Sequence, residues 1–220
     1  MSKLVLKNTA ATYDEVYGGG YDKSYPTTDL VRLESWFFKN KPGKALDYGC
    51  GPGTNGMHLL DSGYGVMFTD LVPEALNRVK EKLAKRSGIS DRAETRTVDR
   101  DGDNIPDEAE TYDYVICLSM ISNLGSAENV RHLISEFHRV LKPGGKMIID
   151  INGPASIGTD DRSGDLFEDK LVRYVPKSSE EFSELVLSIP GIEIDEIGFT
   201  TFRYQGRNEH EYILCAHKSS

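Results

Sequence analysis

Cysteine is scarce in this chain, and the few cysteines present exclude two kinds of structural support. The 220 residues contain three of them, Cys50, Cys117 and Cys215. Because they are odd in number, lie far apart and form no CxxC pair, they indicate neither a disulfide framework nor a zinc site. We therefore expect no metal, and a protein of the reducing cytoplasm.

Long hydrophobic runs are also missing. No stretch approaches the ~20 consecutive apolar residues that a membrane span needs. Residues 1–12 lack the charged region followed by an apolar run that marks a signal peptide. We expect a protein that is neither exported nor embedded in a membrane.

Positive charge is in deficit, with 26 lysines and arginines against 35 acidic residues and a net charge of -9. Affinity for nucleic acid comes mostly from clustered lysine and arginine, so we expect no nucleic-acid partner. The length and the 38% of hydrophobic residues fit one domain with a substantial core, or such a domain with a modest extension.

What the sequence does contain is an alternation of short apolar strands and amphipathic helices. Parallel neighbours in a sheet need crossover connections, and helices must then cover both faces of the sheet. The pattern predicts an α/β fold with a doubly wound, mostly parallel, Rossmann-like sheet. The predicted strands are 44–49, 65–70, 93–98, 112–120 and 146–151, and the predicted helices are 29–38, 54–63, 73–88 and 126–141.

The C-terminal part departs from this alternation. Ser178 and Glu181 have the spacing of a capping box at the start of an apolar helical segment. Segments 192–204 and 210–218 then have the pattern of a hairpin joined by the turn QGRN. We therefore expect seven strands, with an antiparallel hairpin at the C-terminal end.

Two segments are predicted to enclose the substrate. Residues 1–43 are expected to form an N-terminal lid or cap with one helix, and residues 44–220 the core. The stretch from about 152 to 177 is too long for an ordinary connection, so it is a binding loop or a disordered segment, and we expect a substrate flap. Its acidic residues would attract a cationic amine or are simply solvated: Asp160, Asp161, Asp165, Glu168 and Asp169.

The predicted ligand site lies where the first strand ends, because ligands of open parallel sheets bind outside the carboxyl ends of the strands. This exit reads DYGCGPG, in which Gly49, Gly51 and Gly53 allow a ligand to approach main-chain N–H groups. Thr54 stands where the dinucleotide fingerprint has its third glycine, which weakens a nicotinamide interpretation. Asp70 ends the second strand and can accept hydrogen bonds from both hydroxyls of a ribose. A plain tight turn and a helix cap remain the alternatives.

Five motifs in order resemble those of the class I S-adenosylmethionine-dependent methyltransferases. They are ALDYGCGPG, FTDLVPEAL, DRDGDNIP, YDYVICLSMISNL and LKPGGKMIIDI, and they lie within residues 44–151. Short-chain dehydrogenases share the first two motifs and lack the last, so the methyltransferase is favoured. The resemblance implies an enzyme whose cofactor is S-adenosyl-L-methionine and whose product is S-adenosyl-L-homocysteine.

The resemblance also implies roles for matching residues. The three glycines would face the methionine part of the cofactor. Asp47 would be oriented toward its ammonium group, directly or through water, and a carboxylate suits that cation. Asp70 would hold the ribose and Leu71 would pack on the adenine. Either Asp99 or Asp101 would lie near the adenine amino group, and the loop length and the end of the third strand favour different choices.

Just past the fourth strand, Ser119, Met120 and Ile121 would line the sulfonium and the transferred methyl. Methyltransferases of nucleic-acid base amines usually carry Asn or Asp, Pro-Pro and an aromatic residue here, whereas this chain has SMIS. We therefore expect methyl transfer by direct displacement to oxygen or nitrogen of a small soluble metabolite. The alternatives are a protein or peptide methyltransferase, a nicotinamide-dependent oxidoreductase and a non-catalytic cofactor-binding module. The sequence indicates no particular catalytic base.

Tyr13, Tyr17, Tyr21 and Tyr25 are spaced four residues apart, but Gly18–Gly20 interrupt the run. An aromatic face beside a glycine hinge suits a lid that closes over the cofactor and the acceptor. Our hypothesis is that the glycines divide these tyrosines between segments. Some would then shield the methyl from water and offer hydroxyls to the acceptor. The alternative is that all four only pack the N-terminal arm on the core.

Overall fold

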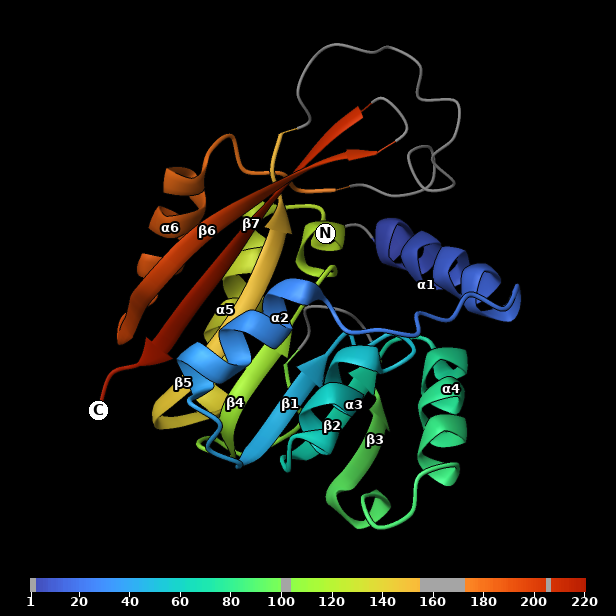
Figure 1. Ribbon diagram of the computed structural model, residues 1–220. Helices are drawn as coiled ribbons and strands as arrows, with labels where there is room; N and C mark the ends of the chain where they lie inside the picture. Colours follow the sequence, from blue (N-terminus) through green and yellow to red (C-terminus); the bar gives the residue numbers. More distant parts are fainter. Residues whose placement is uncertain (1–2, 100–103, 155–172, 205–206) are drawn as a thin grey trace.

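One seven-stranded sheet organises the chain (Figure 1), with the strand order β3-β2-β1-β4-β5-β7-β6. The computed structural model describes residues 3–99, 104–154, 173–204 and 207–220. Strands β1 to β5 run parallel, and β7 is antiparallel to both β5 and β6. The predicted fold class is thereby confirmed. The strands are β1 Lys44–Tyr48, β2 Gly65–Asp70, β3 Ala93–Thr97, β4 Tyr112–Cys117, β5 Leu141–Asn152, β6 Ile192–Tyr204 and β7 Arg207–Lys218.

Helices cover both faces of the sheet, as alternation along the strands requires. Ala45 of β1 belongs to the buried cluster that includes α2, α3 and α4, whereas Leu46 belongs to the cluster that includes α5 and α6. In Figure 1, α2 and α3 lie in front of the sheet and α5 lies behind it. The helices are α1 Lys3–Gly18, α2 Thr28–Leu33, α3 Thr54–Asp61, α4 Pro73–Ala84, α5 Ala127–Val140 and α6 Ser179–Leu187, with the short turns η1 Glu34–Phe38, η2 Ser90–Arg92 and η3 Ile121–Leu124.

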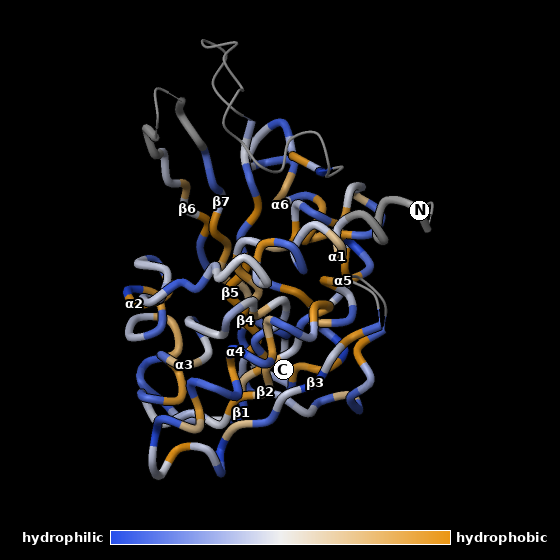
Figure 2. The backbone as a smooth tube through the Cα atoms, turned by 90° about the vertical axis from the view of Figure 1, so that its right-hand side faces the viewer, coloured by the Kyte–Doolittle hydropathy of each residue, from blue (hydrophilic) through white to orange (hydrophobic). Residues whose placement is uncertain are grey.

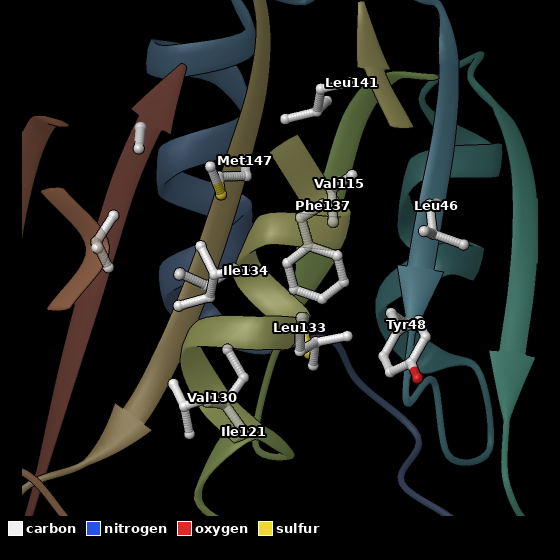
Figure 3. Close-up of a cluster of buried hydrophobic side chains, with 14 of the residues drawn as sticks. Leu46, Tyr48, Val115, Ile121, Val130, Leu133, Ile134, Phe137, Leu141 and Met147 are labelled. Atoms are coloured by element: carbon white, nitrogen blue, oxygen red, sulfur yellow. The ribbon is translucent and has the colours of Figure 1, made fainter. Parts of the chain in front are cut away.

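The core is densest where α5 packs on the central strands. Its stripe of Val130, Leu133, Ile134 and Phe137 is fully buried. The ring of Phe137 meets that of Tyr48 edge to face, with 5.5 Å between centroids (Figure 3). Figure 2 shows hydrophobic residues gathered along the central strands, with polar segments toward the outside. This packing holds the carboxyl ends of β1 and β4 in fixed positions.

Several local signals in the sequence act as expected. The Ser126 hydroxyl caps α5 by accepting a hydrogen bond from the N–H of Asn129 at 3.2 Å. Pro73 occupies the first turn of α4. The hydroxyl of Ser178 accepts from the N–H of Glu181. The Glu181 carboxylate accepts from the N–H of Lys177 at 2.8 Å, one residue before the position that a capping box implies.

Some predicted boundaries are displaced. The helix expected over 73–88 ends at Ala84, and the helix expected over 29–38 is α2 followed by the π-helical turn η1. Strand β5 begins at Leu141 rather than at Lys146, because Leu141 already pairs with Tyr112 before the register shifts. Strand β7 begins at Arg207, inside the predicted turn, where it pairs with Tyr204.

The N-terminal segment is attached to the carboxyl edge of the sheet. Helix α1 lies beside α4 (Figure 1), where Tyr17 packs with Val72 and Ala75. The connection between α1 and α2 is tied to the start of α3. There, the Thr54 hydroxyl donates to the carbonyl of Lys23 at 2.6 Å. The described part of this segment, residues 3–43, therefore reaches the predicted ligand site.

Candidate active site

The site is at the point where the strand order reverses. From β1 the chain proceeds outward to β2, whereas β4 lies on the opposite side of β1 and leads to β5. Ligands of open α/β sheets bind outside the carboxyl ends of the strands at such a point. The turn after β1, the end of β2 and the segment after β4 meet α1 there.

The turn after β1 depends on glycine geometry. Gly49, Gly51 and Gly53 have φ values of 67°, 52° and 76°, in the left-handed region that favours glycine. A Cβ on Gly49 would lie 2.6 Å from Cγ of Met120, and a Cβ on Gly51 would lie 2.9 Å from the hydroxyl of Tyr17. The turn is therefore in close contact with β4's exit on one side and with α1 on the other.

Asp70 ties this turn to the end of β2. Its Oδ2 accepts a hydrogen bond from the N–H of Gly51 at 2.7 Å, and its Oδ1 accepts from the N–H of Val72 at 2.9 Å. Burial raises the pKa of the Asp70 carboxyl, and the main-chain N–H groups oppose that rise. Because each carboxylate oxygen has a further lone pair, Asp70 retains capacity to accept hydrogen bonds from a ligand.

Asp47, the acidic residue of β1, is 2% exposed. Its Oδ2 accepts from the N–H of Gly56, at the first turn of α3, at 2.9 Å. Burial raises the pKa of Asp47 to about 7, the Gly56 N–H lowers it and the charge of Asp70 raises it further. A neighbouring cation would favour the ionised form of this carboxyl.

A cavity that is partly open to solvent joins these elements. Seven of the residues that the sequence singled out meet in its lining. The lining consists of Thr9, Ala10, Tyr13, Tyr17, Gly49, Asp70, Leu71, Val72, Ser119, Met120 and Asn123.

The four tyrosines have different environments, because α1 ends at Gly18. Tyr13 and Tyr17 stack with ring centroids 6.0 Å apart and line the cavity. Tyr21 and Tyr25 lie beyond the helix, 54% and 68% exposed, and do not line it. The glycines thus divide the tyrosines between segments, and two of the four line the cavity. Burial, with the charge of Asp70, raises the pKa of Tyr17.

The remaining predicted residues lie elsewhere. Asp99 follows β3 and is exposed, outside the cavity lining. Asp101 and most of the predicted flap lie outside the described residues. Asp47, Gly51 and Gly53 are also outside the cavity lining. Ser119, by contrast, does line the cavity; it is exposed and has a φ of 62°, an uncommon conformation for a residue other than glycine.

Sequence reasoning missed some residues that build this site. Asn123 of η3 donates from Nδ2 to the hydroxyl of Tyr13 at 2.9 Å. Lys82 of α4 donates from Nζ to the carbonyl of Pro52 at 2.9 Å and to the carboxylate of Asp22 at 2.5 Å. Lys82 therefore fastens the connection after α1 to the glycine turn. Asn123 lies within the motif YDYVICLSMISNL but the resemblance gives it no role there, and no motif marks Lys82. The partners of both residues are distant in sequence.

Comparison with known proteins agrees with this geometry. A methyltransferase-domain family model matches residues 45–145. The chain is 35% identical over 147 residues to the sterol 4-C-methyltransferase strm-1 of Caenorhabditis elegans, with 62% of this chain and 42% of that protein covered. It is 29% identical over 165 residues to the uncharacterized methyltransferase sll0829 of Synechocystis, with 74% of this chain and 69% of that protein covered.

A solved structure shows the same fold over nearly the whole chain. It is the 1,6-didemethyltoxoflavin-N1-methyltransferase of Burkholderia thailandensis, with bound 1,6-didemethyltoxoflavin and S-adenosylhomocysteine. The TM-score is 0.72 at 17% identity, with 97% of this chain and 88% of that chain covered. At 17% identity, the similarity shows that the two proteins share a fold and no more than that.

Fold and site together define an α/β enzyme domain of the Rossmann-like type, with its ligand site at the strand-order reversal. With the domain match over residues 45–145 added, the findings support a class I S-adenosylmethionine-dependent methyltransferase. The family's cofactor is S-adenosyl-L-methionine, and the comparisons support this assignment over a nicotinamide-dependent oxidoreductase. The chain spans less than half the length of the nematode relative.

Among the described residues, no helix combines the length and the hydropathy required to cross a membrane. The same residues contain no group of three or more histidines, cysteines and acids arranged to hold a metal ion.

The glycine turn gives a matched pair of substitutions. Gly53 and Gly88 have similar φ values of 76° and 79°, but a Cβ on Gly53 would lie 2.5 Å from Cγ2 of Val79, whereas one on Gly88 meets nothing within 4 Å. We expect Gly88→Ala to lower the free energy of unfolding by about 1–2 kcal/mol through backbone strain alone. Gly53→Ala should lower it by a further ~1–3 kcal/mol through overpacking. Urea denaturation measures both, and equal losses would contradict the steric account.

Asp47 predicts a pH dependence of stability. Its folded pKa of about 7 exceeds the ordinary value of 3.8, so the folded state binds the proton more tightly than the unfolded state. The contribution of this group to stability is therefore greatest below about pH 4 and is lost as pH rises through about 7. In the variant Asp47→Asn this part of the change in the free energy of unfolding with pH disappears. Urea denaturation at pH 5 and pH 7.5 measures that change in wild type and variant. An equal change in both proteins would rule the prediction out.

Proposed function

We propose that this protein transfers a methyl group from S-adenosylmethionine to oxygen or nitrogen of a small soluble metabolite by direct displacement. The observation that carries the proposal is the single cavity in which the glycine turn, Asp70 and the segment after β4 meet the stacked tyrosines of α1. The domain match supports the reaction type, and the geometry supports the place where it occurs.

The residues of the cavity and its walls fit the cofactor. Asp47, whose pKa of about 7 reflects burial without a cation, would receive the ammonium group. Asp70 would accept hydrogen bonds from the ribose hydroxyls with its remaining lone pairs. Leu71, in the lining, would pack on the adenine. When bound, the cofactor supplies a methyl group on a positively charged sulfur.

The segment after β4 and helix α1 would form the reacting end of the site. Ser119 and Met120 lie in the same lining as Tyr13 and Tyr17. A methyl group on a sulfonium is already activated, so alignment of the nucleophile and exclusion of water account for most of what the protein adds. Alignment of this kind contributes about 7–11 kcal/mol. The stacked tyrosines would exclude water from the methyl.

A small acceptor fits better than a protein chain, because α1 closes one side of the cavity. The similar Burkholderia protein is named as a 1,6-didemethyltoxoflavin-N1-methyltransferase. Methyl transfer from labelled cofactor to a metabolite panel, beside a peptide panel, tests the acceptor class. Labelling of peptides alone would overturn this part of the proposal.

Asp70→Asn tests the cofactor site directly. The substitution keeps the shape but removes the charge and one acceptor oxygen, so we expect the affinity for S-adenosylhomocysteine to fall at least about tenfold, or ~1.4 kcal/mol. Asp91→Asn, at an exposed acid of η2, should leave the affinity unchanged. Isothermal calorimetry measures both. Wild-type protein that binds neither S-adenosylmethionine nor S-adenosylhomocysteine would defeat the proposed function.

The tyrosines give a second test. We expect Tyr17→Ala and Tyr13→Ala to lower kcat more than Tyr17→Phe and Tyr13→Phe, because ring removal opens the cavity to water. Tyr21→Ala and Tyr25→Ala, at exposed positions, should change kcat little. Thermal denaturation of each variant serves as the stability control. If the cavity tyrosines affect turnover no more than their loss of stability explains, they only pack the N-terminal arm.

A further inference from the structure

Strand β5 extends past the end of β4, and its last residues lie beside the segment that follows β4. The last pair of the β4–β5 ladder is Cys117 with Ile149, whereas β5 continues to Asn152 by pairing with β7. Among the described residues, β5 therefore has no ladder partner on the β4 side from residue 150 onward. The segment after β4, residues 118–124, lies on that side and contributes Ser119, Met120 and Asn123 to the cavity lining.

Two hydrogen bonds from this extension of β5 hold the segment after β4. Oδ1 of Asp150 accepts from the N–H of Ser119 at 2.6 Å, and the N–H of Asn152 donates to the hydroxyl oxygen of Ser122 at 2.9 Å. Asp150 is 1% exposed and Ser122 is 4% exposed, so water competes little for either bond. Side chains thus attach the segment to the sheet where the main-chain ladder has ended.

The residue that donates to Asp150 has an uncommon backbone conformation. Ser119 has a φ of 62°, in the left-handed region, where a residue with a Cβ is strained. Such strain persists only where the surrounding structure holds it, and it is common at functional sites. Met120 follows directly, and a Cβ on Gly49 would lie 2.6 Å from the Cγ of Met120. The conformation of Ser119 therefore affects how Met120 meets the glycine turn.

The charge state of Asp150 determines which substitution preserves the bond to Ser119. Burial, and next the charge of Glu211, raise the pKa of Asp150 well above its ordinary value, while the Ser119 N–H and the charge of Lys23 lower it. This direction favours the neutral acid, whose carbonyl oxygen still accepts a hydrogen bond. An asparagine side chain has nearly the same shape and one carbonyl oxygen, so it can replace the neutral acid, whereas alanine offers no acceptor.

We propose that Asp150 is a positioning residue for methyl transfer, which fixes Ser119 and Met120 at the reacting end of the cavity by holding the N–H of Ser119. Asp150 is not part of the cavity lining, so it acts through Ser119 and exchanges no proton with the acceptor. This inference rests on the proposed function and adds a residue that controls alignment. An error of about 1 Å in alignment can lower the rate about a hundredfold, so a small shift of this segment is measurable in kcat.

The first test observes the segment after β4 without turnover. Protein carrying ¹³C-labelled methionine methyl groups is saturated with S-adenosylhomocysteine, and the NMR signal of Met120 is assigned with Met120→Leu. We expect Asp150→Ala to shift or broaden this signal, and Asp150→Asn to leave it close to its wild-type position.

Asp113→Ala is the matched control. Oδ2 of Asp113 also accepts from a main-chain N–H, that of Lys44 at 2.8 Å, but at the amino ends of β4 and β1. Its loss should lower the stability of the protein without changing the Met120 signal, because the cavity lies at the opposite edge of the sheet.

Turnover with an acceptor from the metabolite panel gives the second test. Asp150→Ala should lower kcat at least about tenfold. Its affinity for S-adenosylhomocysteine should stay within about threefold of wild type, because Asp70 and the glycine turn are unchanged. Asp150→Asn should retain most of kcat, and Asp113→Ala should retain all of it. If the alanine variant does not fold, Asp150→Leu, which fills the space but offers no acceptor, takes its place with the same expectations.

A glycine at position 119 tests the backbone conformation itself. Glycine adopts a positive φ without strain, so the bond from Asp150 matters less in Ser119→Gly protein. We expect Asp150→Ala to lower kcat by a smaller factor in that background than in wild type.

The outcomes separate this inference from the function on which it rests. If the protein binds S-adenosylhomocysteine but Asp150→Ala leaves the Met120 signal or kcat as in wild type, the inference is overturned and the proposed function stands. An asparagine variant as impaired as the alanine variant, or an equal loss of kcat in both backgrounds at position 119, also overturns it. If no cofactor binds at all, the proposed function itself fails.

Discussion

Main-chain N–H groups hold buried carboxylates along the carboxyl edge of the sheet, and the rest of the site depends on this arrangement. The N–H of Gly56 binds Asp47, that of Gly51 binds Asp70, and that of Ser119 binds Asp150. Each acid ends or nearly ends its strand, β1, β2 or β5, so the parallel sheet brings them to one edge. The bonds to the N–H groups of Gly51 and Ser119 also tie down the glycine turn and the segment after β4, which contribute Gly49 and Ser119 to the cavity lining.

The same arrangement sets the chemistry. Burial raises the pKa of all three carboxyls, and the main-chain N–H groups that bind them oppose that rise. A site of this kind favours ligands that bring positive charge or hydroxyl donors, and the methyl donor of the family brings both. The arrangement suits a cation better than an anion, consistent with the net charge of -9.

The N-terminal segment completes the cavity through a few long-range contacts. Lys82 and Thr54 bind the connection after α1, and Asn123 binds Tyr13. These contacts join α1 to α3, α4 and the segment after β4, so one helix covers residues from three different strand exits. Its aromatic face is thereby placed where water must be excluded.

The sequence by itself determined the strand and helix order, the glycine turn and the position of Asp70, because periodicity, caps and left-handed glycines act over a few residues. It did not determine which tyrosines meet the cavity, since Tyr13 and Tyr21 have the same spacing signal but only one belongs to α1. Lys82 and Asn123 have partners far along the chain. Only the tertiary structure decided them, because contacts between distant segments depend on how helices pack and on strand register, which no local pattern encodes.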